Sequence, residues 1–281
     1  MMVVDVTYSL GTKNRKQEFH FLCDIPVGQF VTIFGKSGVG KTTFLRILAG
    51  LEKPSSGSIH FQSDLWFHAE KGIDLKAHKR NIKMVFQQNT LFPNMTVRQN
   101  LEFAKSDRTD FNYKNEIVSG LDIEAFMDFY PHQLSGGQAQ RVAIGQMLIG
   151  KPNCVLLDEP LTSLDQSIRI QIQEFLKATQ RKYKMTVILV SHDVEETIKL
   201  SDQVLILENG AFKAQGSPFE IFGNVGGSKS SVVGKVVRVT ENSSKFITVF
   251  LLVGHQIIEQ EHPISDLDQY KLGSSITLPL A

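Results

Sequence analysis

The stretch Leu134-Ser135-Gly136-Gly137-Gln138 decides the fold class, because two further segments with recognisable chemistry flank it. Upstream, Gly35-Lys36-Ser37-Gly38-Val39-Gly40-Lys41-Thr42 matches the G-x-x-x-x-G-K-[ST] phosphate loop. Downstream, Val155-Leu156-Leu157-Asp158-Glu159 is an apolar run that ends in two acids. A glycine-rich turn alone can simply join a strand to a helix, but the three segments in this order predict a nucleotide-binding α/β protein.

The composition describes an ordinary globular protein with a proper core. The 281 residues are 42% hydrophobic and 21% charged, and the net charge of +1 gives no electrostatic reason to expect a nucleic-acid partner. No run of about 18 apolar residues is present, and the first eleven residues lack the layout of a signal peptide. The two cysteines, Cys23 and Cys154, do not make a disulfide framework. We therefore expect a cytosolic protein.

Strands and helices are expected to alternate through about residue 215, as in an α/β layer architecture. Residues 30–34, 155–157 and 186–190 are continuous apolar runs, which is typical of parallel strands covered on both faces. Ligands of such sheets bind beyond the carboxyl ends of the strands, so the loop after Phe34, the acids after Leu157 and His192 are expected at one edge. Residues 204–207 and 212–214, joined at Asn209-Gly210, predict a closing hairpin.

The chain is expected to have two domains and a linker. Residues 1–222 form the nucleotide-binding domain, and residues 223–231 are a flexible linker rich in glycine and serine. Residues 232–281 form a small β domain, with strands expected at 232–240, 246–253, 256–259 and 276–280 and no convincing helix. About 50 residues make a marginal core, so this domain is expected to pack on the main domain, on its twin in another chain, or on both.

The residues of the phosphate loop have distinct expected roles. Gly35, Gly38 and Gly40 let the backbone approach the phosphates closely, and the loop amides with the following helix form an anion site. Lys41 is expected at the β- and γ-phosphates, and the Thr42 hydroxyl at Mg²⁺. A second anion site is expected where Ser135, Gly136 and Gly137 begin a helix.

Together these motifs resemble the nucleotide-binding subunit of an ABC transporter, over residues 1–222. The resemblance implies a P-loop ATPase domain with a helical subdomain, followed by a small all-β domain, and it implies ATP and Mg²⁺ as ligands. The residues expected to contact the nucleotide are Tyr8, Gly35, Lys36, Ser37, Gly38, Val39, Gly40, Lys41, Thr42, Thr43, Ser135, Gly136, Gly137, Gln138 and Asp165.

The resemblance also assigns the remaining chemistry. Asp158 holds Mg²⁺ together with Thr42 and Gln87, and Glu159 is the general base that polarises the attacking water. His192 contacts the γ-phosphate and Gln87 reaches the metal and the water. Tyr8 is the candidate that stacks on adenine, against simple strand packing, since Leu10-Gly11 stands where the family has an aromatic residue and glycine.

In this family the signature segment of one subunit, which Leu134-Ser135-Gly136-Gly137-Gln138 resembles, closes over the ATP held by the phosphate loop of another. A head-to-tail homodimer follows by resemblance, with Asp165 at the seam, on the cytoplasmic face of the inner membrane. Residues 88–100, with Phe92 and Met95, resemble the part of importer ATPases that receives a separate membrane permease, and buried packing is the alternative for those two side chains. An extracytoplasmic solute-binding protein belongs to such systems.

The end of the chain resembles an abbreviated TOBE or molybdate-binding β module, which favours import of molybdate. Sulfate, tungstate, polyamine, sugar and iron are the other solutes considered. Three further classes stay open: an ABC ATPase without a transport role, another P-loop NTPase such as a kinase, and a binding module that no longer hydrolyses ATP. Single motifs without a long coiled-coil insertion disfavour the first, the signature disfavours the second, and retention of Lys41, Asp158, Glu159 and His192 disfavours the third.

Overall fold

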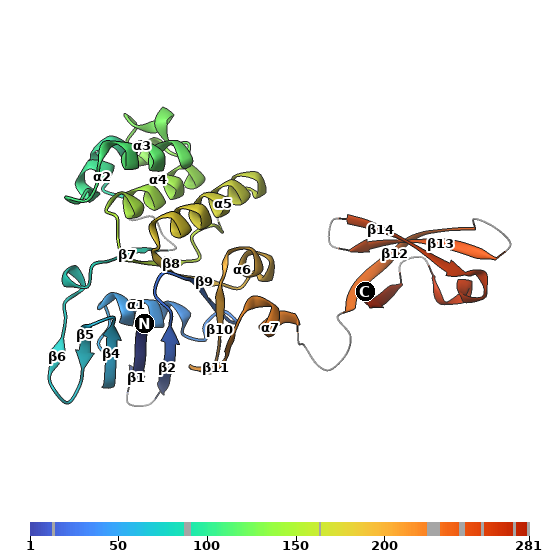
Figure 1. Cartoon of the computed structure of the whole chain (residues 1–281), viewed down its shortest axis with the longest axis horizontal. Helices are drawn as coiled ribbons and strands as arrows, with labels where there is room; N and C mark the ends of the chain where they lie inside the picture. The colour runs from blue at the N-terminus through green and yellow to red at the C-terminus, as the bar shows by residue number, and fades with distance from the viewer. Residues whose placement is uncertain are drawn as a thin grey trace. The chain divides into compact units, whose positions relative to one another are not determined.

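A computed structural model describes residues 1–12, 15–86, 91–162, 164–223, 231–241, 245–253, 256–271 and 274–279. The chain divides into two compact units, Met1–Ile221 and Phe222–Ala281 (Figure 1). The predicted linker at 223–231 falls for the most part outside the described residues, since residues 224–230 are not among them. The larger unit contains all the described motifs.

Over the described ranges, the larger unit has one mixed sheet of eleven strands in the order β6-β5-β4-β1-β2-β11-β10-β3-β9-β8-β7. Its antiparallel half contains β1 (Met2–Thr12), β2 (Arg15–Ile25), β4 (Ser56–Phe61), β5 (Asp64–His68) and β6 (Ile73–Asp74). Its parallel half contains β3 (Phe30–Phe34), β7 (Ile82–Val85), β8 (Cys154–Asp158), β9 (Thr186–Ser191) and β10 (Gln203–Glu208). The remaining strand, β11 (Ala211–Gly216), joins the halves, antiparallel to β10 and parallel to β2.

The predicted alternation of strands and helices is wrong for the first 74 residues, where one α-helix accompanies five antiparallel strands and one parallel strand. In β1 the buried residues are Met2, Val4, Val6 and Tyr8, and the residues between them are more exposed. This period of two is typical of an antiparallel strand with one face in the core. The hairpin of β10 and β11 is confirmed, and Asn209 and Gly210 both have positive φ, 48° and 78°, as its tight turn requires.

The parallel strands are buried on both faces, which explains their continuous apolar sequence. Along β8, Cys154 and Leu156 pack in one hydrophobic cluster, whereas Val155 and Leu157 pack in another. Strand β9 divides in the same way, with alternate residues in the two clusters. Successive side chains of a strand point to opposite faces, so each strand ties both layers together.

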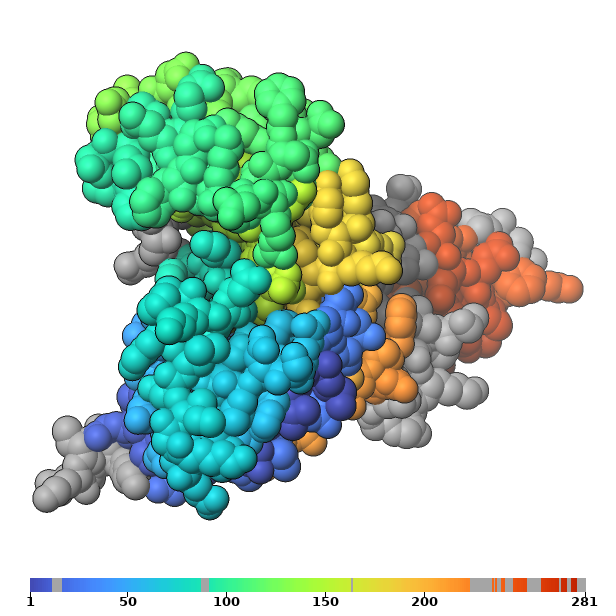
Figure 2. Space-filling model, turned by 60° about the vertical axis from the view of Figure 1, so that its left-hand side comes forward, coloured from blue at the N-terminus to red at the C-terminus, as the bar shows by residue number. Residues whose placement is uncertain are grey.

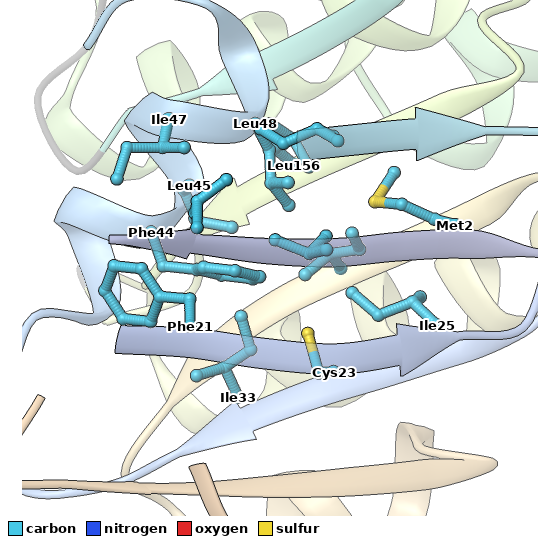
Figure 3. Packing of buried hydrophobic residues seen from close by; sticks show 14 of the residues in the cluster. Met2, Phe21, Cys23, Ile25, Ile33, Phe44, Leu45, Ile47, Leu48 and Leu156 are labelled. Carbon is cyan, nitrogen blue, oxygen red and sulfur yellow. The ribbon is translucent and has the colours of Figure 1, made fainter. Parts of the chain in front are cut away.

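The first cluster is covered by α1 (Lys41–Ala49), the helix that follows the phosphate loop. Phe44, Leu45 and Leu48 of α1 are fully buried, and Figure 3 shows them beside Leu156 of β8 and residues of β1 and β2. Burying each such side chain stabilises the fold by about 1.5–3 kcal/mol. The buried Arg80 donates hydrogen bonds to the carbonyls of Ile47 (2.8 Å) and Leu48 (2.9 Å) at the end of α1.

The second cluster joins the other face of the sheet to a group of helices. These are α2 (Val97–Ala104), α3 (Phe111–Gly120), α4 (Gly136–Ile149) and α5 (Gln166–Tyr183). Figure 1 draws α2, α3 and α4 together, and Figure 2 shows this helical group as a lobe above the strands. The larger unit also contains a shorter helix, α6 (Val194–Leu200), and the 3-10 turns η1 (Ala77–Lys79), η2 (Glu124–Phe126) and η3 (Pro131–Gln133). The short helix α7 (Pro218–Gly223) begins in the larger unit and ends two residues beyond its last residue, Ile221. None of the helices in the described ranges has the length and apolarity needed to cross a membrane.

The smaller unit contains four antiparallel strands in its described residues, in the order β14-β13-β12-β15. They are β12 (Ser231–Glu241), β13 (Phe246–Val253), β14 (Gln256–Pro263) and β15 (Ser275–Pro279). A 3-10 helix, η4 (Ile264–Gln269), was not expected from the sequence. Val236, Ile247, Val249 and Leu251 form a small buried cluster, to which Ile264 of η4 adds partly buried area.

Candidate functional site

The phosphate loop connects the carboxyl end of β3 to the start of α1. Gly40 is the N-cap of α1 with φ 107°, and a Cβ there would lie 2.4 Å from Cε1 of Phe19. Both the left-handed backbone and the close ring therefore require glycine at this position. The amides of this loop and of the first turn of α1 make an anion-binding site of the kind expected from the sequence.

Lys41 is folded back over the loop that precedes it. Its Nζ donates hydrogen bonds to the carbonyls of Gly35 (2.8 Å) and Lys36 (3.0 Å), and its side chain is buried. Burial lowers the pKa of the Lys41 ammonium, while the nearby carboxylates of Glu159 and Asp158 oppose that shift. The loop thus holds a desolvated positive charge beside its amides, where a phosphate group would meet it with little rearrangement.

Thr42 and Asp158 form a pair of oxygen ligands beside Lys41. The Thr42 hydroxyl donates a 3.1 Å hydrogen bond to Oδ1 of Asp158, which ends β8 and is only 5% exposed. Burial raises the pKa of Asp158, and the hydrogen bond from Thr42 opposes the shift. Carboxylate and hydroxyl oxygens are hard ligands that suit Mg²⁺, which also binds phosphate oxygens and water. The residues present therefore fit the expected metal.

Glu159 lies next to His192 although 32 residues separate them in the chain. Strands β8 and β9 are parallel with Asp158 opposite Val190, so the residues that follow each strand meet at one edge. Nδ1 of His192 is 3.3 Å from Oε1 of Glu159. Glu159 has φ 46°, a left-handed conformation that costs about 1–3 kcal/mol in a residue other than glycine. The fold holds this carboxylate in a strained but fixed position.

A cavity of about 280 Å³ unites most of these groups. It is lined by Leu10, Gln17, Phe19, Ser37, Gly38, Gly40, Lys41, Thr42, Thr43, Asp158 and Glu159. Gly35, Lys36 and Val39 instead line a different cavity, beside the end of β10. Gly35 and Lys36 contribute to the phosphate loop through their carbonyls, which accept the hydrogen bonds from Lys41, whereas Val39 packs against the core.

Tyr8, the residue expected to stack on adenine, packs in the hydrophobic core. The side chain is 9% exposed, lies in the first hydrophobic cluster and donates a 2.9 Å hydrogen bond to Oε2 of Glu52. It does not line the phosphate-loop cavity, whereas Leu10, which is 48% exposed, and Gln17 do. Strand packing, the alternative reading of Tyr8, fits its position. Leu10 and Gln17 are register partners across β1 and β2, and neither was expected to line the site.

The signature residues lie at the start of α4 and do not line this cavity in the single chain. Ser135 and Gln138 cap the helix reciprocally, because the Gln138 amide donates to Ser135 Oγ (3.2 Å) and the Ser135 amide donates to Gln138 Oε1 (2.8 Å). Ser135 and Gly136 are exposed, and a Cβ at Gly136 would meet no atom within 4 Å. The helix start with Gly137 is therefore open to a ligand or partner from outside.

Asp165 also caps a helix. Its carboxylate accepts hydrogen bonds from the Ile168 amide (3.0 Å) and the Ser167 hydroxyl (2.8 Å) at the start of α5, and these bonds lower its pKa. The side chain is exposed and is not in the phosphate-loop cavity. Gln87 lies outside the described residues, as do 88–90, so its expected role stays a prediction.

The phosphate loop, the buried lysine and the acid pair at the carboxyl edge of a parallel sheet define a P-loop nucleotide-binding domain. Comparison with known proteins narrows this class. The family model described as "ABC transporter" matches residues 20–162, which is about half of the chain. The chain belongs to the ABC transporter family, as an ATP-binding subunit.

Two curated relatives carry the names of importer subunits. The spermidine/putrescine import ATP-binding protein PotA of Spiroplasma citri is 42% identical over 204 residues, which cover 71% of this chain and 57% of that protein. The probable sulfate/thiosulfate import ATP-binding protein CysA of Chlorella vulgaris is 40% identical over 203 residues, covering 70% of this chain and 84% of that protein. The match thus spans little more than half the length of the first relative.

A solved structure supports the fold directly. The ATP-binding cassette MJ0796, in a dimeric post-hydrolysis state bound to ADP and Pi, superposes with a TM-score of 0.68 at 28% identity. The match covers 78% of this chain and 99% of that one. The ABC ATPase fold predicted from the sequence is confirmed for the larger unit.

Proposed function

We propose that this chain is the ATP-hydrolysing subunit of an ABC importer, which powers uptake of a small solute through a separate membrane permease. The observation that carries the proposal is the convergence of Lys41, Thr42–Asp158 and Glu159–His192 at one edge of the sheet. An anion site, a pair of oxygen ligands and a carboxylate beside a histidine are the parts that phosphoryl transfer to water needs. The importer names of the relatives support the direction of transport.

In this mechanism the loop amides and Lys41 hold the β- and γ-phosphates, and Thr42 and Asp158 hold Mg²⁺. The metal ion, when bound, neutralises charge on the phosphate oxygens. Glu159 accepts a proton from the water that attacks the γ-phosphorus. The bond between that phosphorus and the oxygen bridging it to the β-phosphate breaks, and ADP leaves with this oxygen while the γ-phosphorus becomes inorganic phosphate. His192 lies 3.3 Å from Glu159, which supports a role in positioning this carboxylate, and its contact with the γ-phosphate is part of the proposal.

We further propose a head-to-tail homodimer as the active form. The start of α4 presents Ser135 and Gly136 to solvent and leaves the phosphate-loop cavity of its own chain without a signature segment. A second copy that places its α4 start over this cavity supplies the missing anion contacts. The dimeric state of the related cassette MJ0796 is consistent with this arrangement. Asp165, exposed at the start of α5, is then proposed to lie at the seam.

The helical group offers a surface for the permease, as the resemblance implies. Phe92 and Phe103 are exposed by 37% and 65% and pack edge to face with their ring centres 4.8 Å apart. They line a cavity of about 240 Å³ together with residues of β7 and α4. An exposed aromatic pair beside a cavity is typical of an interaction site, so we propose that a permease segment docks here, at the cytoplasmic face of the membrane. A solute-binding protein outside the membrane would complete the system.

The transported solute is a separate question. Molybdate, favoured by the sequence of the smaller unit, remains a hypothesis, and we propose that this unit is a TOBE-like module appended to the ATPase. The two relatives are named for a polyamine and for an oxyanion, and neither name is molybdate. Specificity in importers of this kind is expected to lie in the permease and the binding protein, and the alternatives of sulfate, polyamine, sugar or iron fit the same ATPase.

ATP turnover by the purified chain tests the proposal. We expect Mg²⁺-dependent hydrolysis that Lys41→Ala abolishes together with nucleotide binding. Glu159→Gln is expected to keep ATP binding, to lose nearly all turnover and to accumulate an ATP-bound dimer. A Glu159→Gln protein that hydrolyses ATP at the wild-type rate removes this residue from the role of general base, and a wild-type protein without turnover in any nucleotide removes the ATPase function.

A further inference from the structure

A buried carboxylate, Glu196, lines the same cavity as His192 and has no role in the proposed hydrolysis. Glu196, in the first turn of α6, is 8% exposed. Its Oε2 accepts a 2.6 Å hydrogen bond from the Ser191 hydroxyl, and its Oε1 accepts one of 3.3 Å from Nε2 of Gln173 on α5. Ionisable groups are rarely buried unless they are hydrogen-bonded, so these two donors explain how the Glu196 carboxyl group can be buried.

The hydrogen bond from Ser191 fixes the backbone on both sides of His192. A hydroxyl has one hydrogen, and donating it to Glu196 leaves the oxygen lone pairs of Ser191 free to accept. The Asp193 amide donates to that oxygen at 3.1 Å. The Glu196 amide in turn donates to Oδ1 of Asp193 at 3.1 Å. Ser191, Asp193 and Glu196 therefore form a closed set of hydrogen bonds around the segment that carries His192.

The His192 ring itself has little to hold it. Its side chain is 57% exposed, and its ring nitrogen Nδ1 lies 3.3 Å from Oε1 of Glu159. An exposed side chain of this kind depends on its backbone for direction, because few neighbours restrict its rotamer. The rigid backbone from Ser191 to Asp193 is thus the means by which the ring stays close to Glu159.

The same cluster reaches the helix that starts at the proposed dimer seam. Gln173 and Arg169 are both on α5, whose N-cap is Asp165. Arg169 lines a cavity of about 310 Å³ beyond Glu159, together with Leu161, Thr162, Ser191, His192, Asp193 and Glu196. The groups with charge that face Glu196 are Asp193 from α6 and Arg169 from α5. Gln173 thus connects the cluster to the helix that begins after Asp165.

We propose that Glu196 is a positioning residue, which fixes Ser191 and Asp193 so that His192 stays oriented toward Glu159. The inference rests on the proposed ATP hydrolysis, in which Glu159 and His192 act on the attacking water. Glu196 touches neither nucleotide nor water in this scheme and works through the hydrogen bond to Ser191. Its effect is thus expected on turnover and not on the phosphate loop, since Lys41 and Thr42 line one cavity beside Glu159 and Glu196 lines another.

The test compares Glu196→Ala with Glu195→Ala in the full chain, measuring kcat for Mg-ATP and the dissociation constant of Mg-ADP. Glu195 is the matched control, because it is the same residue type on the same turn of α6 but is exposed. We expect Glu196→Ala to lower kcat by roughly 10- to 100-fold, the loss typical of a misplaced catalytic group, with ADP affinity unchanged. Glu196→Gln, whose amide oxygen still accepts from Ser191, is expected to recover most of the turnover.

Two further variants make the outcome decisive. Ser191→Ala is expected to lower kcat as much as Glu196→Ala, and the double variant no more than either, because both act through one hydrogen bond. Equal kcat in Glu196→Ala and Glu195→Ala overturns the inference, as does a parallel loss of turnover and ADP affinity. If Glu196→Ala does not fold, Ser191→Ala and Glu196→Gln decide the matter, and wild-type kcat in Ser191→Ala overturns it. A wild-type chain without ATPase activity would instead refute the proposed function.

Discussion

Replacing Thr42 by valine removes one hydroxyl from the site and leaves its shape nearly unchanged. The lost bond is the 3.1 Å donation to Asp158, a carboxylate that is almost fully buried. Hydrogen bonds to charged groups contribute about 1.5–3 kcal/mol, and the exposure of Thr42 on the cavity side places this one at the lower end. We expect the free energy of unfolding without nucleotide to fall by about 1.5 kcal/mol.

The same substitution removes a proposed Mg²⁺ ligand. Since 1.4 kcal/mol corresponds to a factor of ten, we expect kcat/KM for ATP at limiting Mg²⁺ to fall at least about tenfold. The unfolding energy is measured by urea titration of the fluorescence of Trp66, the only tryptophan of the sequence. Thr43→Val is the control, because Thr43 lines the same cavity. If the two variants have the same stability and the same Mg²⁺ dependence, the pairing of Thr42 with Asp158 has no role in the site.

Three further predictions concern the phosphate loop, the adenine site and the effect of pH on stability. Gly40→Ala is expected to weaken ATP binding, measured by calorimetry, more than Gly38→Ala does. Both positions have a positive φ, but only the alanine Cβ at position 40 would clash with Phe19. Equal losses of ATP affinity would contradict this. Tyr8→Phe is expected to leave ATP affinity unchanged while Leu10→Ala weakens it, since of these two residues only Leu10 lines the cavity. A loss of ATP affinity in Tyr8→Phe and none in Leu10→Ala would instead support Tyr8 as the adenine contact. Burial raises the pKa of Glu196, so the folded chain keeps the proton on this carboxyl to a higher pH than the unfolded chain does. The free energy of unfolding of the wild type should therefore fall relative to that of Glu196→Gln as pH rises from the ordinary glutamate pKa of about 4.3 through the raised value. Urea titrations across that range give the difference, and a constant difference would show that Glu196 ionises as freely in the folded chain as in the unfolded one.

Much of the larger unit could be predicted because its apolar runs are local signals. The strands β3, β8 and β9 are buried on both faces, so each reads as a continuous apolar stretch, and a parallel register brings the residues that follow them together. The antiparallel strands of the first 74 residues carry a different signal. From Met2 to Tyr8 of β1 every second residue is buried, and this period would also have placed Tyr8 in the core.

Other site residues could not be found in this way, because their positions depend on contacts between distant segments. Leu10 and Gln17 line the cavity through the register of β1 with β2. The bond between Gln173 and Glu196 depends on how α5 packs beside α6, and no short motif contains both residues. For the signature segment the structure of one chain adds little, because no residue of this segment lines the phosphate-loop cavity of its own chain. Its expected partner, the phosphate loop of a second copy, came from the family resemblance.

A cross-link between chains tests the nucleotide-sandwiched dimer most directly. Ser37→Cys lies in the phosphate-loop cavity and Ser135→Cys at the exposed start of α4, each placed in a separate Glu159→Gln chain. The native Cys23 and Cys154 are buried, and burial raises the pKa of Cys154 to about 12, so neither competes in the folded chain. Mixed with Mg-ATP, the two proteins are predicted to form a disulfide between chains that Mg-ADP does not support. If no disulfide forms between the chains in Mg-ATP, although both proteins are shown to bind ATP, the proposed nucleotide-sandwiched dimer is contradicted.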